Sequence, residues 1–164
     1  MYQPEFMQRA IALSQTALTT PGTEPFGAVI VKEGRVVGEG LNHSLAHFDP
    51  SSHGEVEAMR DACRRLSTVD LSGCELYTSC EPCALCVALM NIVGIGQLFY
   101  ASSLAQSGAA FAQLAPQHRY PIDCDLLRSE CGAQVQQRAM PSAQKMDREA
   151  TAVLKAWAAQ RVKP

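Results

Sequence analysis

The most informative segment for the fold class is Leu76-Tyr-Thr-Ser-Cys-Glu-Pro-Cys-Ala-Leu-Cys86. Its first residues complete a short β-strand. Pro82 then suits the first turn of a helix, because proline lacks the amide proton that a helix start leaves unused. Cys83 and Cys86 are three residues apart, so the predicted helix places both on one face. A strand that leads directly into a helix is a typical unit of an α/β fold.

The rest of the chain alternates strands and helices in the same way. Helices are predicted where apolar residues recur every three or four positions, and strands where short apolar runs lie between turn residues. No element is assigned between residues 115 and 132. The predicted helices cover residues 5–18, 53–66, 83–91 and 144–160, and the predicted strands cover residues 27–31, 36–41, 74–78, 97–101 and 133–138. This alternation predicts an α/β sandwich with helices packed on a sheet.

Length and charge limit the possible functions. The 164 residues fit one domain, and 47% hydrophobic against 18% charged residues is typical of a globular protein. A formal net charge of −2 does not provide the broad cationic field of most polynucleotide-binding proteins, which argues against a nucleic-acid partner. No apolar run approaches the roughly 20 residues that span a bilayer, and the N-terminal residues lack a signal-peptide layout. We therefore expect a cytoplasmic protein without a membrane partner.

The seven cysteines favour metal binding or catalysis over disulfides. An odd number without a secretory signal argues against a disulfide framework. His53, Cys83 and Cys86 offer one nitrogen and two sulfur ligands, a set that suits zinc. A catalytic zinc keeps three protein ligands and leaves the fourth position for water, whereas a structural zinc normally has four. No fourth Cys or His stands at motif spacing, although nearby Cys80 leaves a structural site open as an alternative.

Glu55 is the candidate proton carrier. It lies two residues after His53, close enough to take a proton from a water molecule on the metal and deliver it to a substrate. Both short motifs stand at the predicted start of a helix. Backbone amides and the helix dipole favour negative charge there and lower the pKa of Cys83. The arrangement indicates general acid–base chemistry at a zinc site.

The order His53-Gly54-Glu55 followed by Pro82-Cys83-Ala84-Leu85-Cys86 is similar to the signature of zinc nucleobase deaminases. On these motifs the chain resembles the cytidine-deaminase-like superfamily. Within that superfamily, residues 24–31, 49–60 and 76–86 look most like bacterial guanine deaminases.

This resemblance implies an architecture and an assembly. The implied fold is a three-layer α/β sandwich with a central, mixed, five-stranded sheet flanked by helices, as a single domain over residues 1–164. One zinc ion per subunit and a homodimer are also implied. In some members the C-terminal segment, here about residues 140–164, is exchanged with the partner subunit.

The resemblance also implies site residues. They are the zinc ligands His53, Cys83 and Cys86, the proton shuttle Glu55, and the substrate contacts Asn42, Phe26 and Gly54. Asn42 would hydrogen-bond the substrate ring, Phe26 would form an aromatic wall of the base pocket, and the Gly54 amide would face a substrate carbonyl. Ser79 and Cys80, at the end of the strand before the cysteine helix, line either the pocket or the protein core.

The chain departs from guanine deaminases where that family holds the purine. Those enzymes place acidic residues after the last motif strand and near the C-terminus, but residues 107–114 and 135–140 contain none. Gln113 is the nearest candidate. Because a buried site cannot omit hydrogen-bond acceptors without a large loss of affinity, the sequence supports the reaction better than the substrate.

The predicted activity is zinc-dependent hydrolytic deamination of a free nucleobase, with release of ammonia. Guanine, converted to xanthine, is the leading substrate. Cytosine or another aminated purine, pterin or triazine ring is the alternative. A tRNA adenosine deaminase and a structural zinc module remain as further hypotheses.

Overall fold

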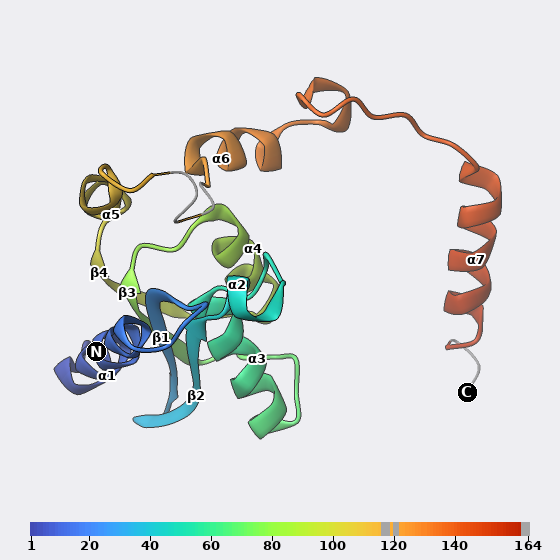
Figure 1. The fold of residues 1–164 in the computed structure, drawn as a ribbon. Coiled ribbons are helices and arrows are strands. Elements are labelled where there is room, and N and C mark those ends of the chain that lie inside the picture. Colours follow the sequence, from blue (N-terminus) through green and yellow to red (C-terminus); the bar gives the residue numbers. More distant parts are fainter. Residues whose placement is uncertain (116–118, 120–121, 162–164) are drawn as a thin grey trace. The chain divides into compact units, whose positions relative to one another are not determined.

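The computed structural model describes residues 1–115, 119 and 122–161. Its sheet contains β1 (Glu24–Lys32), β2 (Arg35–Asn42), β3 (Cys74–Cys80) and β4 (Gln97–Ser102), in the order β2-β1-β3-β4 (Figure 1). β1 pairs antiparallel with β2 and β3, and β3 pairs parallel with β4. The predicted mixed sheet is therefore confirmed over its first four strands.

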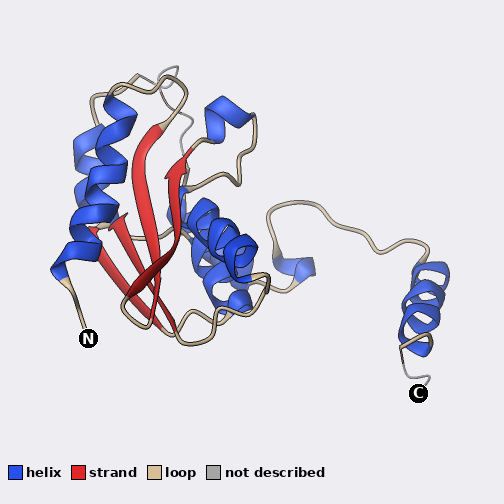
Figure 2. Cartoon of the chain, turned by 90° about the horizontal axis from the view of Figure 1, so that it is seen from below, coloured by secondary structure: helices blue, strands red, loops and turns tan. Residues whose placement is uncertain are grey.

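Helices cover both faces of this sheet (Figure 2). One face packs against α1 (Pro4–Gln15), and the other packs against α3 (Gly54–Leu66) and α4 (Ala84–Val93). Side chains alternate along β1, so Val29 lies in the cluster with α1 and Ile30 in the cluster with α3 and α4. Both are fully buried, which explains why this strand is a continuous apolar run.

Glycine lets α3 approach β2 closely. A Cβ atom at Gly40 would lie 2.2 Å from the Gly54 carbonyl oxygen and 2.3 Å from the Ala58 backbone nitrogen. Both neighbours are backbone atoms of α3, so they cannot rotate away as a side chain would. This contact fixes the N-terminal turn of α3 against the end of β2 that carries Asn42.

The prediction of a fifth strand at residues 133–138 is wrong, and the sheet of the described residues has four strands. Val135–Gln137 forms a short 3₁₀-helix, η3. The backbone groups here bond locally: Arg138 Nε donates to the Ala133 carbonyl, and the Ala139 amide donates to Glu130. Two glutamines follow Val135, so the segment has no apolar face to bury against a neighbouring strand.

The predicted helix over residues 5–18 is formed by α1 and by the 3₁₀ turn η1 (Thr16–Leu18) that continues it. Three short helices were not predicted: α2 (Ser44–His47), α5 (Leu104–Phe111) and α6 (Cys124–Gly132). The start of α5 had a recognisable sequence signal. Ser103 and Gln106 form a reciprocal capping box, the spacing that marks helix N-termini.

The chain forms two compact units, Met1–Leu127 and Arg128–Pro164. The second unit contains η3 and α7 (Asp147–Ala159), which confirms the predicted terminal helix. Val153, Leu154 and Trp157 of α7 are 69%, 69% and 57% exposed. No helix of the described residues is both long and apolar enough to cross a bilayer.

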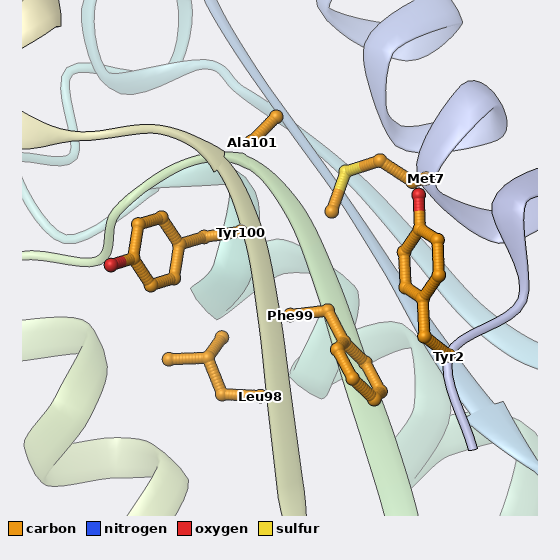
Figure 3. Close-up of a pocket in the computed structure, with 6 residues that line it drawn as sticks. All are labelled: Tyr2, Met7, Leu98, Phe99, Tyr100 and Ala101. Atoms are coloured by element: carbon orange, nitrogen blue, oxygen red, sulfur yellow. The ribbon is translucent and has the colours of Figure 1, made fainter.

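An aromatic pocket lies along β4 on the first unit (Figure 3). Tyr2 stands edge-on to Phe99, with 5.4 Å between ring centroids, and Tyr77 lies 4.8 Å from the same ring. The residues that line the pocket are Tyr2, Met7, Leu98, Phe99, Tyr100 and Ala101. None of the residues proposed for chemistry is among them.

Candidate metal centre and active site

The three predicted metal ligands come from two helix starts. His53 is the N-cap of α3 and Cys83 is the N-cap of α4, both in an extended backbone conformation, and Cys86 lies in the first turn of α4. The helix predicted over residues 83–91 begins at Ala84, and Pro82 comes just before its N-cap, Cys83. The two helix N-termini place these three side chains together, and together they could hold a metal ion.

Their geometry fits a zinc ion. His53 Nδ1 lies 3.5 Å from both sulfur atoms, and the two sulfur atoms lie 3.8 Å apart. Tetrahedral zinc with ordinary bond lengths would place two sulfur ligands about 3.8 Å apart and a sulfur and a nitrogen about 3.6 Å apart. Cys83 and Cys86 are buried and His53 is half-buried, so the ligands are held in the core.

Electrostatics distinguishes the two cysteines. The contact with Cys86 lowers the pKa of Cys83 to about 4; burial opposes this shift and His53 adds to it. The contact with Cys83, together with burial, raises the pKa of Cys86. The contact with Cys83 also raises the pKa of His53, and the carboxylates of Glu55 and Glu24 contribute to that shift. Without metal, Cys83 is therefore a thiolate and Cys86 retains its proton near neutral pH.

Glu55 faces the metal triangle from the first turn of α3. Its Oε2 atom lies 3.4 Å from Cys86 Sγ, and its Oε1 atom accepts a hydrogen bond of 3.0 Å from Thr78 Oγ1. Burial raises the pKa of Glu55, while hydrogen bonds from its own backbone amide and from Thr78 oppose the shift. A buried carboxylate with a raised pKa and a fixed orientation can both accept and donate a proton near neutral pH.

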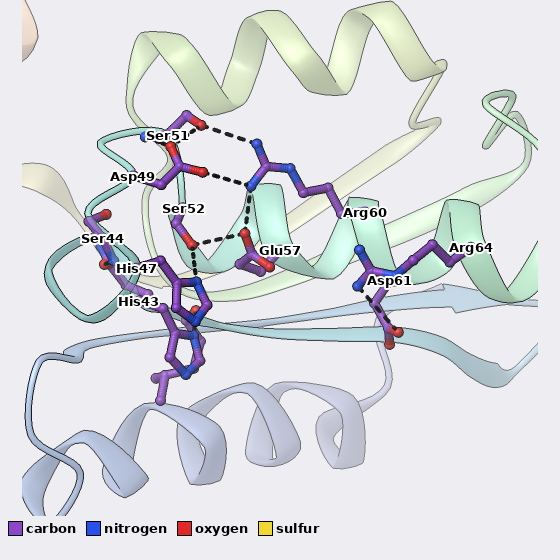
Figure 4. Close-up of polar contacts among 12 residues, drawn as sticks. His43, Ser44, His47, Asp49, Ser51, Ser52, Glu57, Arg60, Asp61 and Arg64 are labelled. Carbon is purple, nitrogen blue, oxygen red and sulfur yellow. Dashed lines mark hydrogen bonds and ion pairs between the residues drawn. The ribbon is translucent and has the colours of Figure 1, made fainter.

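The loop between Asn42 and His53 is held by a polar network (Figure 4). Ser52 is fully buried and donates its hydroxyl proton to Glu57 Oε1 over 2.9 Å. Arg60 donates to the same carboxylate oxygen over 2.6 Å. Because Glu57 and Arg60 belong to α3, the network ties the loop to the helix that follows it. It therefore holds the end of the loop that comes just before His53.

Phe26 and Gly54 are brought together by the structure. A Cβ atom at Gly54 would lie 2.2 Å from the Phe26 carbonyl oxygen, so the helix start packs directly on β1. Phe26 is half-buried and stands edge-on to Phe111, with ring centroids 5.9 Å apart. Ser79 accepts a hydrogen bond of 3.0 Å from the Gly27 amide, so it joins β3 to β1 at this point.

Asn42 is 4% exposed at the end of β2. Its Oδ1 accepts from the Ser44 amide over 2.9 Å, and its Nδ2 lies 3.5 Å from Glu24 Oε2. Cys80 is buried at the end of β3, where burial raises its pKa. Gln113 is exposed just after α5, and no hydrogen bond among the described residues joins it to the other candidates. The substrate-binding roles of these residues stay predictions.

Sequence reasoning missed four residues near the site. Thr78, which orients Glu55, lies on the same face of β3 as Cys80, two residues later, so strand periodicity could have found it. Glu24 and Phe111 flank Asn42 and Phe26, and Arg119 lies over the rings of Phe26 and Phe111. No local pattern marks Arg119, because it falls where no element was assigned.

The fold and the site define a zinc-binding deaminase. Residues 2–102 match the family described as the cytidine and deoxycytidylate deaminase zinc-binding region, and the chain belongs to this family. Among curated proteins, the guanine deaminase of Bacillus subtilis is 38% identical over 110 residues, which cover 67% of this chain and 70% of the relative. The tRNA-specific adenosine deaminase of Aquifex aeolicus is 40% identical over 81 residues, 49% of this chain and 54% of that protein.

The chain is also similar to a solved structure of guanine deaminase from Bacillus subtilis. The TM-score is 0.84 at 31% identity, and the match covers 100% of this chain and 98% of the other. The structural match thus includes the C-terminal third, whereas the sequence match with the curated relative covers two thirds of this chain.

Proposed function

We propose that the protein is a zinc-dependent hydrolytic deaminase of a free nucleobase, with guanine as its leading substrate and xanthine and ammonia as the products. One observation carries the proposal: the His53, Cys83 and Cys86 triangle lies against the buried carboxylate of Glu55. Three ligands rather than four are typical of a catalytic zinc site. Cys80, the open alternative for a fourth ligand, is outside the group of metal-ligating atoms.

A bound zinc ion acts as a Lewis acid and lowers the pKa of water to about 7. In the deamination, water adds across the C=N bond at the amino-bearing ring carbon, and the amine then leaves as ammonia while the new hydroxyl group becomes a ring carbonyl. Glu55 would take one proton from the attacking water and deliver it to the ring nitrogen, and would then move the proton of the new hydroxyl group to the departing amine. The bond from Thr78 fixes one carboxylate oxygen, so the other, 3.4 Å from Cys86 Sγ, stays directed at the metal side.

Substrate orientation falls to Asn42, Phe26 and the Gly54 amide. The Asn42 carbonyl oxygen is occupied by the Ser44 amide, so its side-chain NH₂ group is the part that offers hydrogen bonds. Phe26 supplies an apolar ring surface beside it, on which a flat heterocycle can stack. Ser79 and Cys80 close the β3 end of the site, and Gln113 is the candidate contact from the segment after α5.

Guanine leads because of the likeness to guanine deaminase of Bacillus subtilis in both sequence and structure. Cytosine and other aminated purine, pterin or triazine rings are kept as alternatives because residues 107–114 and 135–140 lack acids. A tRNA substrate is the second candidate, favoured by the likeness to a tRNA-specific adenosine deaminase. The net charge of −2 weighs against it, since binding a polynucleotide relies on cationic contacts.

We also propose a cytoplasmic homodimer of a single domain whose residues 140–164 are exchanged between subunits. The apolar side chains of α7 support exchange, because Val153, Leu154 and Trp157 are left exposed within one chain. A thiolate pair at the metal suits a reducing compartment. Light scattering would give the mass in solution, with 17.7 kDa for a monomer and twice that for the dimer.

The test of function is ammonia release by zinc-loaded protein. The panel holds guanine, cytosine, adenine, their nucleosides, aminated pterins and triazines, and a tRNA, with zinc-depleted protein as the control. Release from guanine supports the proposal, and release from another free ring shifts it to that substrate. Release from tRNA alone supports the second candidate. No release from any substrate contradicts a deaminase and favours a structural zinc.

A further inference from the structure

A charged cluster lies at the two residues that the proposed function assigns to the substrate. Arg119 Nε lies 3.4 Å from Glu24 Oε1, and Glu24 Oε2 lies 3.5 Å from Asn42 Nδ2. The Arg119 guanidinium stands 5.3 Å from the ring centroid of Phe26 and 4.6 Å from that of Phe111. All five residues belong to the Met1–Leu127 unit. A carboxylate and a guanidinium thus meet beside the candidate base pocket.

The hydrogen-bonding capacity of this cluster is not used up. In the part of the chain that the structure describes, the buried Arg119 Nε atom has no hydrogen-bond partner, although the Glu24 carboxylate is within ion-pair distance. The bond from Asn42 to Glu24 is at the limit of hydrogen-bond length. A carboxylate can accept about four hydrogen bonds, and a buried donor without a partner costs free energy. The Glu24 side chain, 16% exposed, is therefore shielded from water but still able to accept from a ligand.

We infer that Glu24 accepts a hydrogen bond from a ring N–H group of the substrate, with Arg119 as the positioning residue that holds this carboxylate. The inference rests on the proposed function and deepens it, because it names the acceptor that residues 107–114 and 135–140 do not provide. The preferred ligands are aminated rings that also present an N–H donor, as guanine does. A ring of the same size without that donor leaves the Glu24 carboxylate desolvated and unpaired.

The experiment removes the donor from the substrate and the acceptor from the protein. Guanine, 1-methylguanine and 9-methylguanine are compared, since each methyl group replaces one ring N–H. The wild-type protein should lose about 10- to 100-fold in kcat/KM on the methylated ring whose N–H faces Glu24. The ratio of kcat/KM for guanine to kcat/KM for that methylated ring is called the gap here. Glu24→Ala frees space and removes the acceptor, so the gap should shrink to about threefold. Glu24→Gln, of the same size, should raise KM for guanine more than it lowers kcat.

Controls separate this role from a structural one. Glu33→Ala removes an exposed carboxylate of the β1–β2 turn and should leave the gap at the wild-type value. Zinc content, measured for every variant, should stay at one per subunit. Arg119→Gln should weaken guanine binding while preserving part of the gap.

An unchanged gap for both methylated rings in Glu24→Ala would overturn the inference while leaving the deaminase intact. Wild-type protein that is silent on every ring would overturn the proposed function, and this inference with it.

Discussion

The two units of the chain use their apolar residues in opposite ways. In the Met1–Leu127 unit, β1, β3 and α3 contribute fully buried side chains, and the metal triangle and Glu55 lie among them. In the second unit, no described residue between 128 and 161 is buried, although α7 carries an apolar stripe. The first unit holds groups whose pKa values are shifted by burial. The second keeps an apolar surface available for another surface to cover.

This difference in burial explains why the family match lies within the first unit. The metal site tolerates little change, because a shift of about 1 Å in a ligand or in Glu55 would spoil its geometry. The family match accordingly lies within residues 2–102. Residues beyond it have fewer packing constraints, and residues 107–114 and 135–140 contain no acidic residue.

The largest expected difference between the two units is the effect of a substitution on catalytic activity. Glu55→Gln should lower kcat/KM by at least about 10²- to 10⁴-fold, since a group that moves more than one proton is lost. Zinc content should be unchanged. Folding raises the pKa of Glu55, so its ionised form costs stability above its unfolded-state pKa. The variant should therefore unfold at the same or a higher temperature.

Glu149→Gln, on α7, is the matched change in the second unit and should keep wild-type activity. A Glu55→Gln protein with more than a tenth of wild-type activity would contradict the shuttle role.

Packing gives the next largest effect. Gly40→Ala should destabilise the protein by about 1–3 kcal/mol, because the new methyl group meets two backbone atoms of α3 that cannot rotate away. Gly132→Ala, which meets no atom within 4 Å, should instead be neutral or gain up to about 1 kcal/mol. Urea unfolding followed by circular dichroism measures both. Equal midpoints for the two variants would remove the packing difference between the units.

Zinc affinity should rise by about tenfold per pH unit between pH 6 and 8. Cys83, with a pKa of about 4, is already a thiolate in this range, but the raised pKa of Cys86 means that zinc must displace its proton. Competition with a chromophoric chelator at each pH gives the slope. Cys131→Ser, an exposed cysteine of the second unit, should leave the curve unchanged. A flat curve would show that Cys86 does not lose a proton on binding.

The smallest expected effect on stability is at α7. Trp157→Ala should change the free energy of unfolding of the first unit by less than about 1 kcal/mol, since the side chain is 57% exposed and not packed in a core. It should nevertheless shift the mass in light scattering toward the monomer if the segment is exchanged. Thermal unfolding and light scattering at several concentrations separate the two effects. A loss of several kcal/mol in a protein that stays monomeric would contradict the exchange.

The candidate metal ligands and Glu55 could be found in the sequence, because they are distinctive residue types at short spacing. His53-Gly54-Glu55 and Cys83-Ala84-Leu85-Cys86 carry their own helix starts, so local structure alone aims their side chains. The four strands and the main helices followed from apolar periodicity for the same reason.

Contacts between segments that are far apart in the sequence could be found only in the folded chain. Within the predicted strand 133–138, Val135–Gln137 forms η3, and the four-stranded sheet of the described residues does not include this segment. Thr78 reaches Glu55 across 23 positions, and Arg119 reaches Glu24 from a segment with no periodicity at all. Such pairs arise when packing closes long loops, so their energies are not encoded in neighbouring residues.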